Sequence, residues 1–530
     1  MQELPTGLQV FEKIRTTGAL YVDKTDMIHK IVSGARMQFF ISRPRRFGKT
    51  LLCWTLNALF SGKRELFEGL AIANTDWVWE SFPVIHLDMS KVTTSLGTDG
   101  VRNSLIRRME YAAQENEIDL RAGETDTGEM LTEIIIKSAK KHGKPAVVIV
   151  DEYDKPFLDF YNKPEMAEDI RDIMRGCYTQ LKANEPHMRF LFMTGISKFT
   201  KAGVFSTLNN LNDISLDENF GTMLGYTEKE LVECFDEHLA ACAEKIKISV
   251  GELVDRLREY YNGFCFDGVH KVYNPFSMLN FLHSSEFDNY WMESANPKII
   301  ADFMKERSLT VEQFRGMSVS RDFVRNPGNI ETAPPENFLY QAGYLTLRER
   351  IDSDFLLDYP NTEVLNSMSR LVSENIIQSD GGEFMDFRTP LIDALTENDC
   401  ELFIETINRL LASIPYDDYM NAAKYGRRKK MPAQEWLYRS TILAFLRGCG
   451  VLTFGEMHSS QGRSDLIVTC RGNTWVIEVK GTSGNDCEAQ AQEAMKQIND
   501  RQYAEPHKNG KKVGIAIDDN TRQIGGWVEA

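Results

Sequence analysis

Gly48, Lys49 and Thr50 are the residues of this sequence best suited to bind a phosphate. They end the segment SRPRRFGKT (42–50), which follows the apolar run 37–41 and precedes the helix-like run 51–60. In a strand–loop–helix arrangement, backbone N–H groups and the helix N-terminus face an anion. The lysine then reaches the outer phosphates, and the threonine hydroxyl binds Mg²⁺. We therefore predict a nucleotide site at these three residues, with Thr50 as a metal ligand.

The same loop departs from the usual phosphate-binding pattern GxxxxGK[ST], because Arg43 occupies the place of its first glycine. Arginine does not adopt glycine's positive φ cheaply, and Pro44 favours an extended conformation for the residue before it. We therefore expect the loop to enter the phosphate site along a different path. Arg45 or Arg46 would add positive charge near the phosphates, and we count Arg46 among the expected nucleotide-binding residues. Exposed arginines, or arginines that bind an acidic partner, are the alternative.

The segment VVIVDEYDKP (147–156) places two carboxylates at the end of an apolar run. A buried strand that delivers Asp151 and Glu152 at its carboxyl end is a Walker-B arrangement. Asp151 would hold the Mg²⁺ shell, and Glu152 would orient or deprotonate the attacking water. The alternative is a core strand followed by a solvated acidic turn. The upstream phosphate loop favours the nucleotide interpretation.

A further apolar run, RFLFMTG (189–195), ends at Thr194, with Ser197 and Lys198 just beyond it. In ATPases that insert a strand between the two Walker motifs, such a polar residue senses the γ-phosphate. We predict this role for Thr194. The same residues could instead cap the next turn.

A second set of candidate residues lies near the carboxyl end, in SDLIVTC (464–470) and TWVIEVK (474–480), which read as two strands joined by a short turn. Because side chains alternate faces along a strand, Glu478 and Lys480 share one face. A turn at 471–472 would place Asp465 opposite Glu478. A turn at 472–473 would place it opposite Lys480. Either register brings the three polar groups onto one face.

Two close carboxylates repel each other, and a divalent cation relieves that repulsion. Carboxylates with water suit Mg²⁺, and Mn²⁺ is also suitable. Asp465 and Glu478 are therefore candidate metal ligands. Lys480 would hold or activate a water, or stabilise negative charge on a phosphate. A surface hairpin with an ion pair, or a nuclease fold that has lost its activity, are the alternatives.

The elements that must position these residues follow from the apolar pattern. Residues 37–194 alternate continuous apolar runs with amphipathic stretches, which predicts a parallel sheet covered by helices on both faces. The runs are 37–41, 84–88, 146–151 and 189–195, and the helix-like stretches lie near 50–61, 101–117, 128–141 and 166–184. The middle, about 226–375, is richer in helix signals, and strands return after 450.

Composition sets limits on the class of protein. The chain has 530 residues, 42% hydrophobic and 26% charged, and its net charge is −16. Two to four domains are expected, and a coat protein of nucleic acid is disfavoured by the charge. The sequence shows no membrane span or secretion signal. Its nine cysteines include no CxxC pair, so a zinc ribbon or a disulfide framework is not indicated, and a cytoplasmic location fits.

Two basic segments, KYGRRKK (424–430) and HKNGKK (507–512), are candidates to contact a phosphodiester backbone. A solvated charged loop is the alternative. Their position beside the carboxyl-terminal site favours nucleic acid.

The amino-terminal half resembles the prokaryotic AAA-ATPase-like family. The resemblance covers roughly 5–225 and rests on LPTGLQVFEKIRTTGALYVDKTDMIH (4–29), SRPRRFGKT and VDEYDKP, in that order. In that family an RPRRFGK[ST] loop stands in for the glycine-rich one. The resemblance implies an ASCE-type P-loop fold. Segments 205–216, 260–268, 272–282 and 338–347 resemble those that follow the ATPase, which implies a helical lid; core packing is the plainer reading.

The carboxyl-terminal region resembles the PD-(D/E)XK nuclease superfamily. It has a helix (433–448), a strand (451–456), the hairpin, a helix (486–503) and a strand (513–518), which is an αβββαβ order. By that match Asp465 and Glu478 are metal ligands and Lys480 is catalytic. Glu435 is the helix carboxylate of the first motif, and Gln497 is a weaker candidate. Serine replaces the motif proline, which provides no ligand.

Together these features predict an α/β multidomain protein. We expect an ASCE-type P-loop ATPase domain with a parallel sheet (1–225), a helical lid or linker domain (226–385) and a restriction-endonuclease-like domain (386–530). ATP binding or hydrolysis would control a Mg²⁺-dependent nuclease that acts on DNA. The alternative is a nucleotide switch whose last domain binds DNA or protein without cutting. Homo-oligomer formation is left open.

Overall fold

The computed structural model of the chain forms two compact units. One contains Met1–Ser294 and Gly316–Thr362, and the other contains Ala295–Arg315 and Glu363–Ala530. The predicted domain boundaries at 225 and 385 stay predictions. None of the described helices combines the length and the apolar composition that a bilayer crossing requires. The structure describes residues 1–160, 163–198, 210–291, 311, 314–325, 334–352, 354–377, 382–413, 433–459, 462–482, 486–500 and 510–530.

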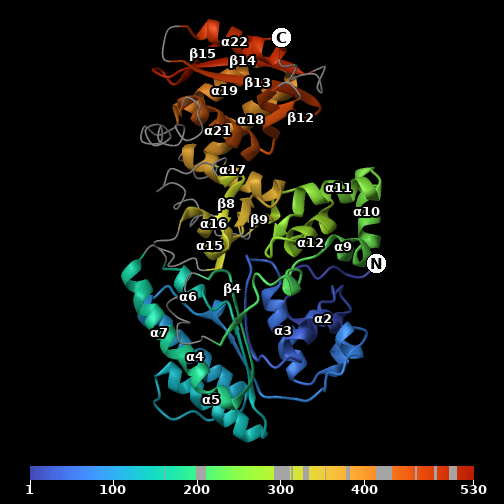
Figure 1. Cartoon of the computed structure of the whole chain (residues 1–530), viewed down its shortest axis with the longest axis vertical. Helices are drawn as coiled ribbons and strands as arrows, with labels where there is room; N and C mark the ends of the chain where they lie inside the picture. Colours follow the sequence, from blue (N-terminus) through green and yellow to red (C-terminus); the bar gives the residue numbers. More distant parts are fainter. Residues whose placement is uncertain are drawn as a thin grey trace. The chain divides into compact units, whose positions relative to one another are not determined.

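A five-stranded parallel sheet organises the first unit (Figure 1). Its strand order is β2-β3-β4-β1-β5. The predicted strand with Thr194, β4, therefore lies between the strand before the phosphate loop, β1, and the strand with Asp151, β3. The strands are β1 (Gln38–Ser42), β2 (Val84–Asp88), β3 (Ala146–Asp151), β4 (Met188–Gly195) and β5 (Asn212–Asp213).

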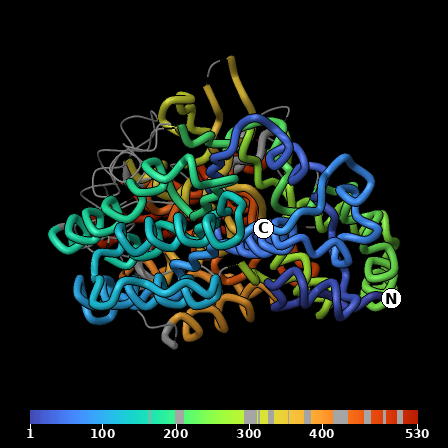
Figure 2. Tube along the Cα trace, turned by 90° about the horizontal axis from the view of Figure 1, so that it is seen from below, coloured from blue at the N-terminus to red at the C-terminus, as the bar shows by residue number. Residues whose placement is uncertain are grey.

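Helices cover both faces of this sheet, as the continuous apolar strands predict. Helix α3 (Lys49–Phe60) packs on one face, and α4 (Gly97–Glu115), α5 (Thr127–His142) and α7 (Pro164–Ala183) pack on the other (Figure 1). These three helices run alongside one another (Figure 2). Strand residues alternate between the two faces, so Val148 and Val150 join the α4–α5–α7 core while Phe190 meets Phe60 of α3.

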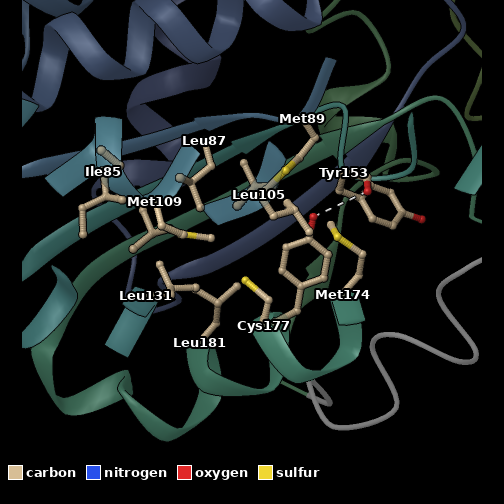
Figure 3. Packing of buried hydrophobic residues seen from close by; sticks show 14 of the residues in the cluster. Ile85, Leu87, Met89, Leu105, Met109, Leu131, Tyr153, Met174, Cys177 and Leu181 are labelled. Carbon is tan, nitrogen blue, oxygen red and sulfur yellow. Dashed lines mark hydrogen bonds between the residues drawn. The ribbon is translucent and has the colours of Figure 1, made fainter. Parts of the chain in front are cut away.

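The core under α4, α5 and α7 is built from large apolar side chains (Figure 3). Ile85 and Leu87 of β2 meet residues of all three helices there, and Tyr153, just beyond β3, closes one end. The hydroxyl of Tyr178 donates a hydrogen bond of 3.5 Å to the carbonyl oxygen of Tyr153. The core therefore reaches up to the carboxyl end of the strands, where the predicted site residues lie.

The rest of the first unit contains more strand than the sequence predicts. Three strands between residues 317 and 358 form an antiparallel sheet of order β8-β10-β9, and two short strands between residues 264 and 272 form a ribbon. The strand TLRERI (346–351) exposes four consecutive residues, so it lacks the alternation by which a strand is predicted. The helices are α1 (Phe11–Thr17), α2 (Thr25–Val32), α6 (Lys155–Leu158), α9 (Glu228–Cys234), α10 (Asp236–Ile246), α11 (Val250–Tyr261), α12 (Pro275–Ser284), α15 (Arg321–Arg325) and α16 (Pro335–Ala342). The strands are β6 (Phe264–Cys265), β7 (Lys271–Val272), β8 (Met317–Ser320), β9 (Thr346–Ile351) and β10 (Asp354–Asp358).

The second unit has a mixed five-stranded sheet of order β11-β12-β13-β14-β15. Only the β13–β14 pair is parallel. The last strand goes beyond the predicted αβββαβ order; its sequence QIGGWVE has two glycines, which weaken a strand signal. The strands are β11 (Leu452–Ser459), β12 (Gly462–Cys470), β13 (Asn473–Thr482), β14 (Lys511–Asp518) and β15 (Gln523–Glu529). The helices are α17 (Thr362–Ile377), α18 (Gly382–Glu397), α19 (Cys400–Ala412), α21 (Ala433–Gly448) and α22 (Cys487–Asp500).

Helix α22 packs on this sheet with its backbone against that of β14. A Cβ atom on Gly514 would lie 2.5 Å from the carbonyl oxygen of Ala491 and 2.8 Å from the amide nitrogen of Met495. Only glycine allows this approach. On the opposite face, Ile477 and Val479 of β13 are fully buried in a core with residues of α18, α19 and α21. The two faces of β13 therefore meet different helices.

Candidate functional site

The phosphate loop holds its lysine against its own backbone. Lys49 is buried, and its Nζ donates to the carbonyl oxygens of Arg43 at 2.9 Å and Pro44 at 2.8 Å. Burial lowers the pKa of Lys49, and the nearby carboxylates of Glu152 and Asp151 oppose this effect. The left-handed residues of the loop are Arg46, with φ 67°, and Gly48, with φ 90°. Arg43 is not among the left-handed residues, so arginine meets no positive-φ cost at this position.

Asp151 lies at the carboxyl end of β3 and faces the start of α3. Burial raises its pKa to about 6; the carboxylate of Glu152 adds to this, while a hydrogen bond from the Thr50 hydroxyl and the charge of Lys49 lower it. The Oδ1 atom of Asp151 is buried and has no hydrogen-bond partner among the described residues. A buried carboxylate oxygen without a partner is costly, and a cation beside it would remove that cost.

Three neighbouring strands end in polar residues on the face covered by α3. Asp88 of β2 is in register with Asp151, and Thr194 of β4 is in register with Ile41 of β1. The Oγ1 atom of Thr194 is buried and lacks a hydrogen-bond partner within the described part of the chain. Asp88 was not among the predicted site residues, although its place at the end of the apolar run 84–88 is the signal that could have found it.

Glu152, the predicted base, stands at a strained position. Its φ is 52°, a conformation that residues other than glycine rarely adopt and that clusters at functional sites. The residue after Glu152 is anchored to the neighbouring strand, because the amide of Tyr153 donates a hydrogen bond of 3.0 Å to the carbonyl oxygen of Thr194. The half-exposed Glu152 carboxylate influences the pKa values of both Lys49 and Asp151. Its charge therefore acts on the two residues that would bind the phosphates and the metal.

The other polar residues after β4 have structural contacts. Asp154 is fully buried and accepts hydrogen bonds from the Ser197 amide at 2.7 Å and the Ser197 hydroxyl at 2.9 Å. A side chain at Gly195 would lie 2.6 Å from Asp154, which explains the glycine there. Lys198 forms an ion pair of 3.1 Å with Asp213. Asp154 thus joins the ends of β3 and β4, a role that sequence analysis did not assign.

These residues suit a nucleotide with its magnesium ion. Thr50 and Asp151 offer one hydroxyl and one free carboxylate oxygen, Lys49 offers a positive charge, and Thr194 offers a free hydroxyl. No group of three or more His, Cys, Asp or Glu side chains in the described ranges is arranged to hold a metal. A small protein ligand set is what Mg²⁺ prefers when phosphates and waters complete its shell.

In the second unit, Glu478 and Lys480 lie on the same face of β13, as predicted. A distance of 3.6 Å separates the Lys480 Nζ from the Glu478 Oε1. The side chain of Glu478 is 1% exposed and that of Lys480 is 20% exposed. This carboxylate is therefore almost completely buried, and the lysine amino group reaches solvent more readily.

The hairpin register agrees with the first of the two predicted alternatives. Cys470 pairs with Asn473 and Leu466 pairs with Ile477, so the turn consists of residues 471–472. Continuing this register by one residue would place Asp465 opposite Glu478. The structure describes the backbone of Asp465 but not its side chain. Its role as a metal ligand stays a prediction.

Glu435 extends from α21 towards the end of β13. Its Oε2 accepts a hydrogen bond of 3.3 Å from the amide of Gly481, the residue after Lys480. Burial raises the pKa of Asp519, and Tyr438, one turn along the same helix, opposes that shift. Gln497 is half-buried on α22. The carboxylate of Glu435 therefore contacts β13, the strand that carries Glu478 and Lys480.

The structure describes only part of the two basic segments predicted to contact nucleic acid. Residues 424–430 and 507–509 lie outside the described residues. Lys511 pairs with Glu529, and the Lys512 Nζ donates to the Asn499 Oδ1 at 2.7 Å. These two lysines already have partners within the second unit.

Two stretches of the chain match models of known families. A model described as "Predicted AAA-ATPase" matches residues 5–205, and a model of the PD-(D/E)XK nuclease superfamily matches residues 433–527. A protein of Azotobacter chroococcum mcd 1, described as an uncharacterized protein in the vnfD 5' region, is 30% identical over 543 residues, which are 99% of this chain and 98% of that protein. The chain belongs to this AAA-ATPase-like family.

The family assignment covers the residues described above. The AAA-ATPase match contains the phosphate loop, Asp151 and Thr194, and the nuclease-superfamily match contains Glu435, Asp465 and the two β13 residues. The ORC2 protein of Aeropyrum pernix, solved as ADPNP–ADP complexes, aligns with 66% of this chain and 92% of that chain at 12% identity, with a TM-score of 0.25. The two family matches together show that the AAA-ATPase-like protein joins an ATPase-like region and a nuclease-like region in one chain.

Proposed function

We propose that the first unit of this AAA-ATPase-like protein binds and hydrolyses ATP with Mg²⁺. The observation that carries the proposal is the convergence of Lys49, Thr50, Asp151 and Thr194 at the carboxyl ends of β3 and β4 and the start of α3. Two of these residues have buried oxygens without partners in the described part of the chain. A nucleotide phosphate with its cation would satisfy both.

The chemistry of this unit follows from the side chains. The Lys49 ammonium exchanges two carbonyl acceptors for phosphate oxygens, Thr50 and Asp151 hold the cation, and Mg²⁺, when bound, neutralises phosphate charge. Glu152 accepts a proton from the attacking water or orients it. The Thr194 hydroxyl donates to the outermost phosphate. Each role needs the side chain to reach the same small volume, which the register of β3 and β4 supports.

For the second unit, we propose phosphodiester hydrolysis with DNA as the substrate. Asp465 and Glu478 would hold a divalent cation, Mg²⁺ or Mn²⁺, which activates water and stabilises charge on the phosphate. Lys480 would orient the attacking water, and Glu435 would fix the end of β13 through Gly481. The nucleotide state of the first unit would control this reaction.

Two variants of the full chain test the two activities. Lys49→Ala should abolish ATP binding, measured by isothermal titration calorimetry. Lys480→Ala should remove Mg²⁺-dependent nicking of supercoiled plasmid while ATP still binds with unchanged affinity. Normal nicking by the Lys480 variant would contradict the catalytic assignment. Normal ATP affinity in the Lys49 variant would contradict the nucleotide site.

The burial of Glu478 supports a second candidate function. A carboxylate that is 1% exposed and paired with Lys480 is also what an inactive domain would retain. In that case the second unit binds DNA or protein without cutting, and the chain is a nucleotide switch. A gel-shift titration with duplex DNA, run beside the nicking assay, separates the cases, because the inactive domain would shift DNA that it does not cut.

A further inference from the structure

Arg43 is among the largest fully buried side chains in the described part of the chain. Its guanidinium donates from Nη1 to the carbonyl oxygens of Ser42 at 2.9 Å and Ser215 at 2.8 Å, and from Nη2 to that of Phe220 at 3.4 Å. It also stacks on the ring of Phe266, 4.2 Å from the ring centroid. Burial lowers its pKa to about 10, so it is still charged at neutral pH.

The backbone of Arg43 contacts the other side of the nucleotide site. Its amide donates to the carbonyl oxygen of Gly195 at 3.2 Å, directly after Thr194. Its carbonyl oxygen accepts one of the two hydrogen bonds of Lys49. One residue therefore contacts both the predicted phosphate lysine and the strand end of the predicted phosphate sensor.

The loop residues after Arg43 also pack on the segment that follows the sheet. The ring of Phe47 lies 4.9 Å from that of Phe264 and 5.2 Å from that of Phe266, and a side chain on Gly343 would collide with Pro44. Phe47 is 1% exposed. The loop is thus held by side-chain contacts to residues 215–220, 264–266 and 343, where an ordinary phosphate loop depends on glycine.

We propose that Arg43 is the positioning residue of the nucleotide loop: its side chain fixes the loop to the segment after the sheet, and its backbone aligns Lys49 with Thr194. The inference rests on the proposed ATP binding. It explains why arginine is used where glycine is usual. The backbone path is set by a buried fork of hydrogen bonds, so positive φ is not needed at this position.

The geometry suits arginine and not lysine. The guanidinium is planar, donates in several fixed directions and stacks on an aromatic ring, whereas an ammonium group is a compact point charge. A lysine at position 43 would keep the positive charge. Its single ammonium group would not donate to the carbonyl oxygens of Ser42, Ser215 and Phe220 and also stack on the ring of Phe266. The conservative exchange Arg43→Lys therefore removes the forked hydrogen bonds of the guanidinium and keeps the positive charge.

The experiment compares Arg43→Lys with a matched exchange elsewhere in the full chain. Arg15 of α1 also binds backbone carbonyls, those of Leu66 at 2.8 Å and Glu68 at 2.7 Å, and has no assigned role in the nucleotide site. We expect Arg43→Lys to raise the Kd for Mg·ATP by at least about tenfold, as for loss of a charged hydrogen bond. Arg15→Lys should leave this Kd within about twofold, the change expected of a surface exchange.

A purely structural role would lower the melting temperature in both variants and leave the Kd of the folded protein unchanged. Hydrogen exchange gives a second readout: in Arg43→Lys, peptides covering 43–49 and 215–220 should exchange faster together. In Arg15→Lys they should not. An unchanged Kd and unchanged exchange in folded Arg43→Lys would overturn the inference.

Phe266→Leu covers the case in which Arg43→Lys does not fold. It removes the stacking surface and keeps every acceptor of Arg43, so it should raise the Kd in the same direction by a smaller factor. A Kd equal to that of the wild type would overturn the inference. If wild-type protein binds no ATP at all, the proposed function fails instead, so the two failures are distinguishable.

Discussion

The hydroxyl of Thr194 is buried at the end of β4 without a hydrogen-bond partner in the described part of the chain. The nearby Ser197 hydroxyl already donates a hydrogen bond to Asp154, and Lys198 forms an ion pair with Asp213. Of Thr194, Ser197 and Lys198, Thr194 is thus the residue whose side-chain oxygen is buried without a partner in the described part of the chain. A buried hydroxyl without a partner costs stability, and a γ-phosphate would remove that cost.

Replacing Thr194 by valine tests this reading. Because the hydroxyl has no partner to lose, Thr194→Val should change the free energy of unfolding by less than about 1 kcal/mol, or increase it. Steady-state phosphate release should fall at least about tenfold in kcat, since a transition-state contact is lost. Urea denaturation measures the first quantity. A destabilised variant with normal kcat would show a structural hydroxyl.

His86 of β2 supplies a pH-dependent contribution to stability. Burial lowers its pKa from 6.5 to about 4; Asp88 opposes the shift and Lys91 adds to it. The ring packs edge-on to Trp54, with centroids 4.8 Å apart. Because the unfolded chain binds this proton more readily, stability should rise with pH between about 4 and 6.5.

His86→Gln should flatten that part of the profile. The difference in unfolding free energy between wild type and variant should grow by on the order of 3 kcal/mol as the pH rises from 4 to 6.5, since one pKa unit is about 1.4 kcal/mol. Chemical denaturation at several pH values measures it. Parallel profiles would show that His86 has an ordinary pKa in the fold.

At the scale of elements, Gly514 fixes how closely α22 approaches the sheet that carries Glu478. Gly514 is in register with Glu478 on the neighbouring strand. An added Cβ would come 2.5 Å from the backbone of Ala491, so the helix must shift. The position of α22 and the surroundings of Glu478 therefore depend on one glycine.

Gly514→Ala should destabilise the second unit by about 1–3 kcal/mol, the cost of overpacking. Mg²⁺-dependent nicking should fall, while ATP affinity stays unchanged because the first unit is not altered. Gly472→Asn is the matched control. Gly472 has φ 94° in an open turn with no atom near its Cβ position, and asparagine tolerates positive φ. Equal losses in both variants would contradict the packing argument.

At the scale of the whole molecule, the prediction is that the nucleotide state sets the nuclease rate. Glu152→Gln should bind ATP with near-normal affinity but hydrolyse it at least about tenfold more slowly, because it lacks the base. The chain would then stay in its ATP state. Its nicking rate should equal the rate of wild type held with a non-hydrolysable ATP analogue, and should differ from the rate with ADP.

A plasmid assay with ATP, ADP, the analogue or no nucleotide measures these rates. Lys49→Ala, which should bind no nucleotide, gives the nucleotide-free rate as the control. Identical nicking under all conditions would show two independent activities in one chain.

Much of the fold follows from the sequence because its signals are local. Continuous apolar runs predict β1 to β4, and the hairpin in β12 and β13 follows from alternation and a short turn. Strand β9 lacks alternation and β15 contains two glycines, so neither was predicted. Thr50, Asp151 and Lys480 were predicted as site residues from motifs and strand ends, which are also local features.

The sequence by itself determined which residues we predict to carry the chemistry: a phosphate loop, two strand-end carboxylates and a Glu-x-Lys strand, each recognised from its neighbours in the chain. Only the tertiary structure decided which hairpin register applies, that Asp88 lies beside Asp151, and that Arg43 is buried. Those facts depend on contacts between residues far apart in sequence, such as Arg43 with Ser215 and Phe266. Local sequence patterns do not predict such partners, because the burial of a residue depends on which distant segments pack against it.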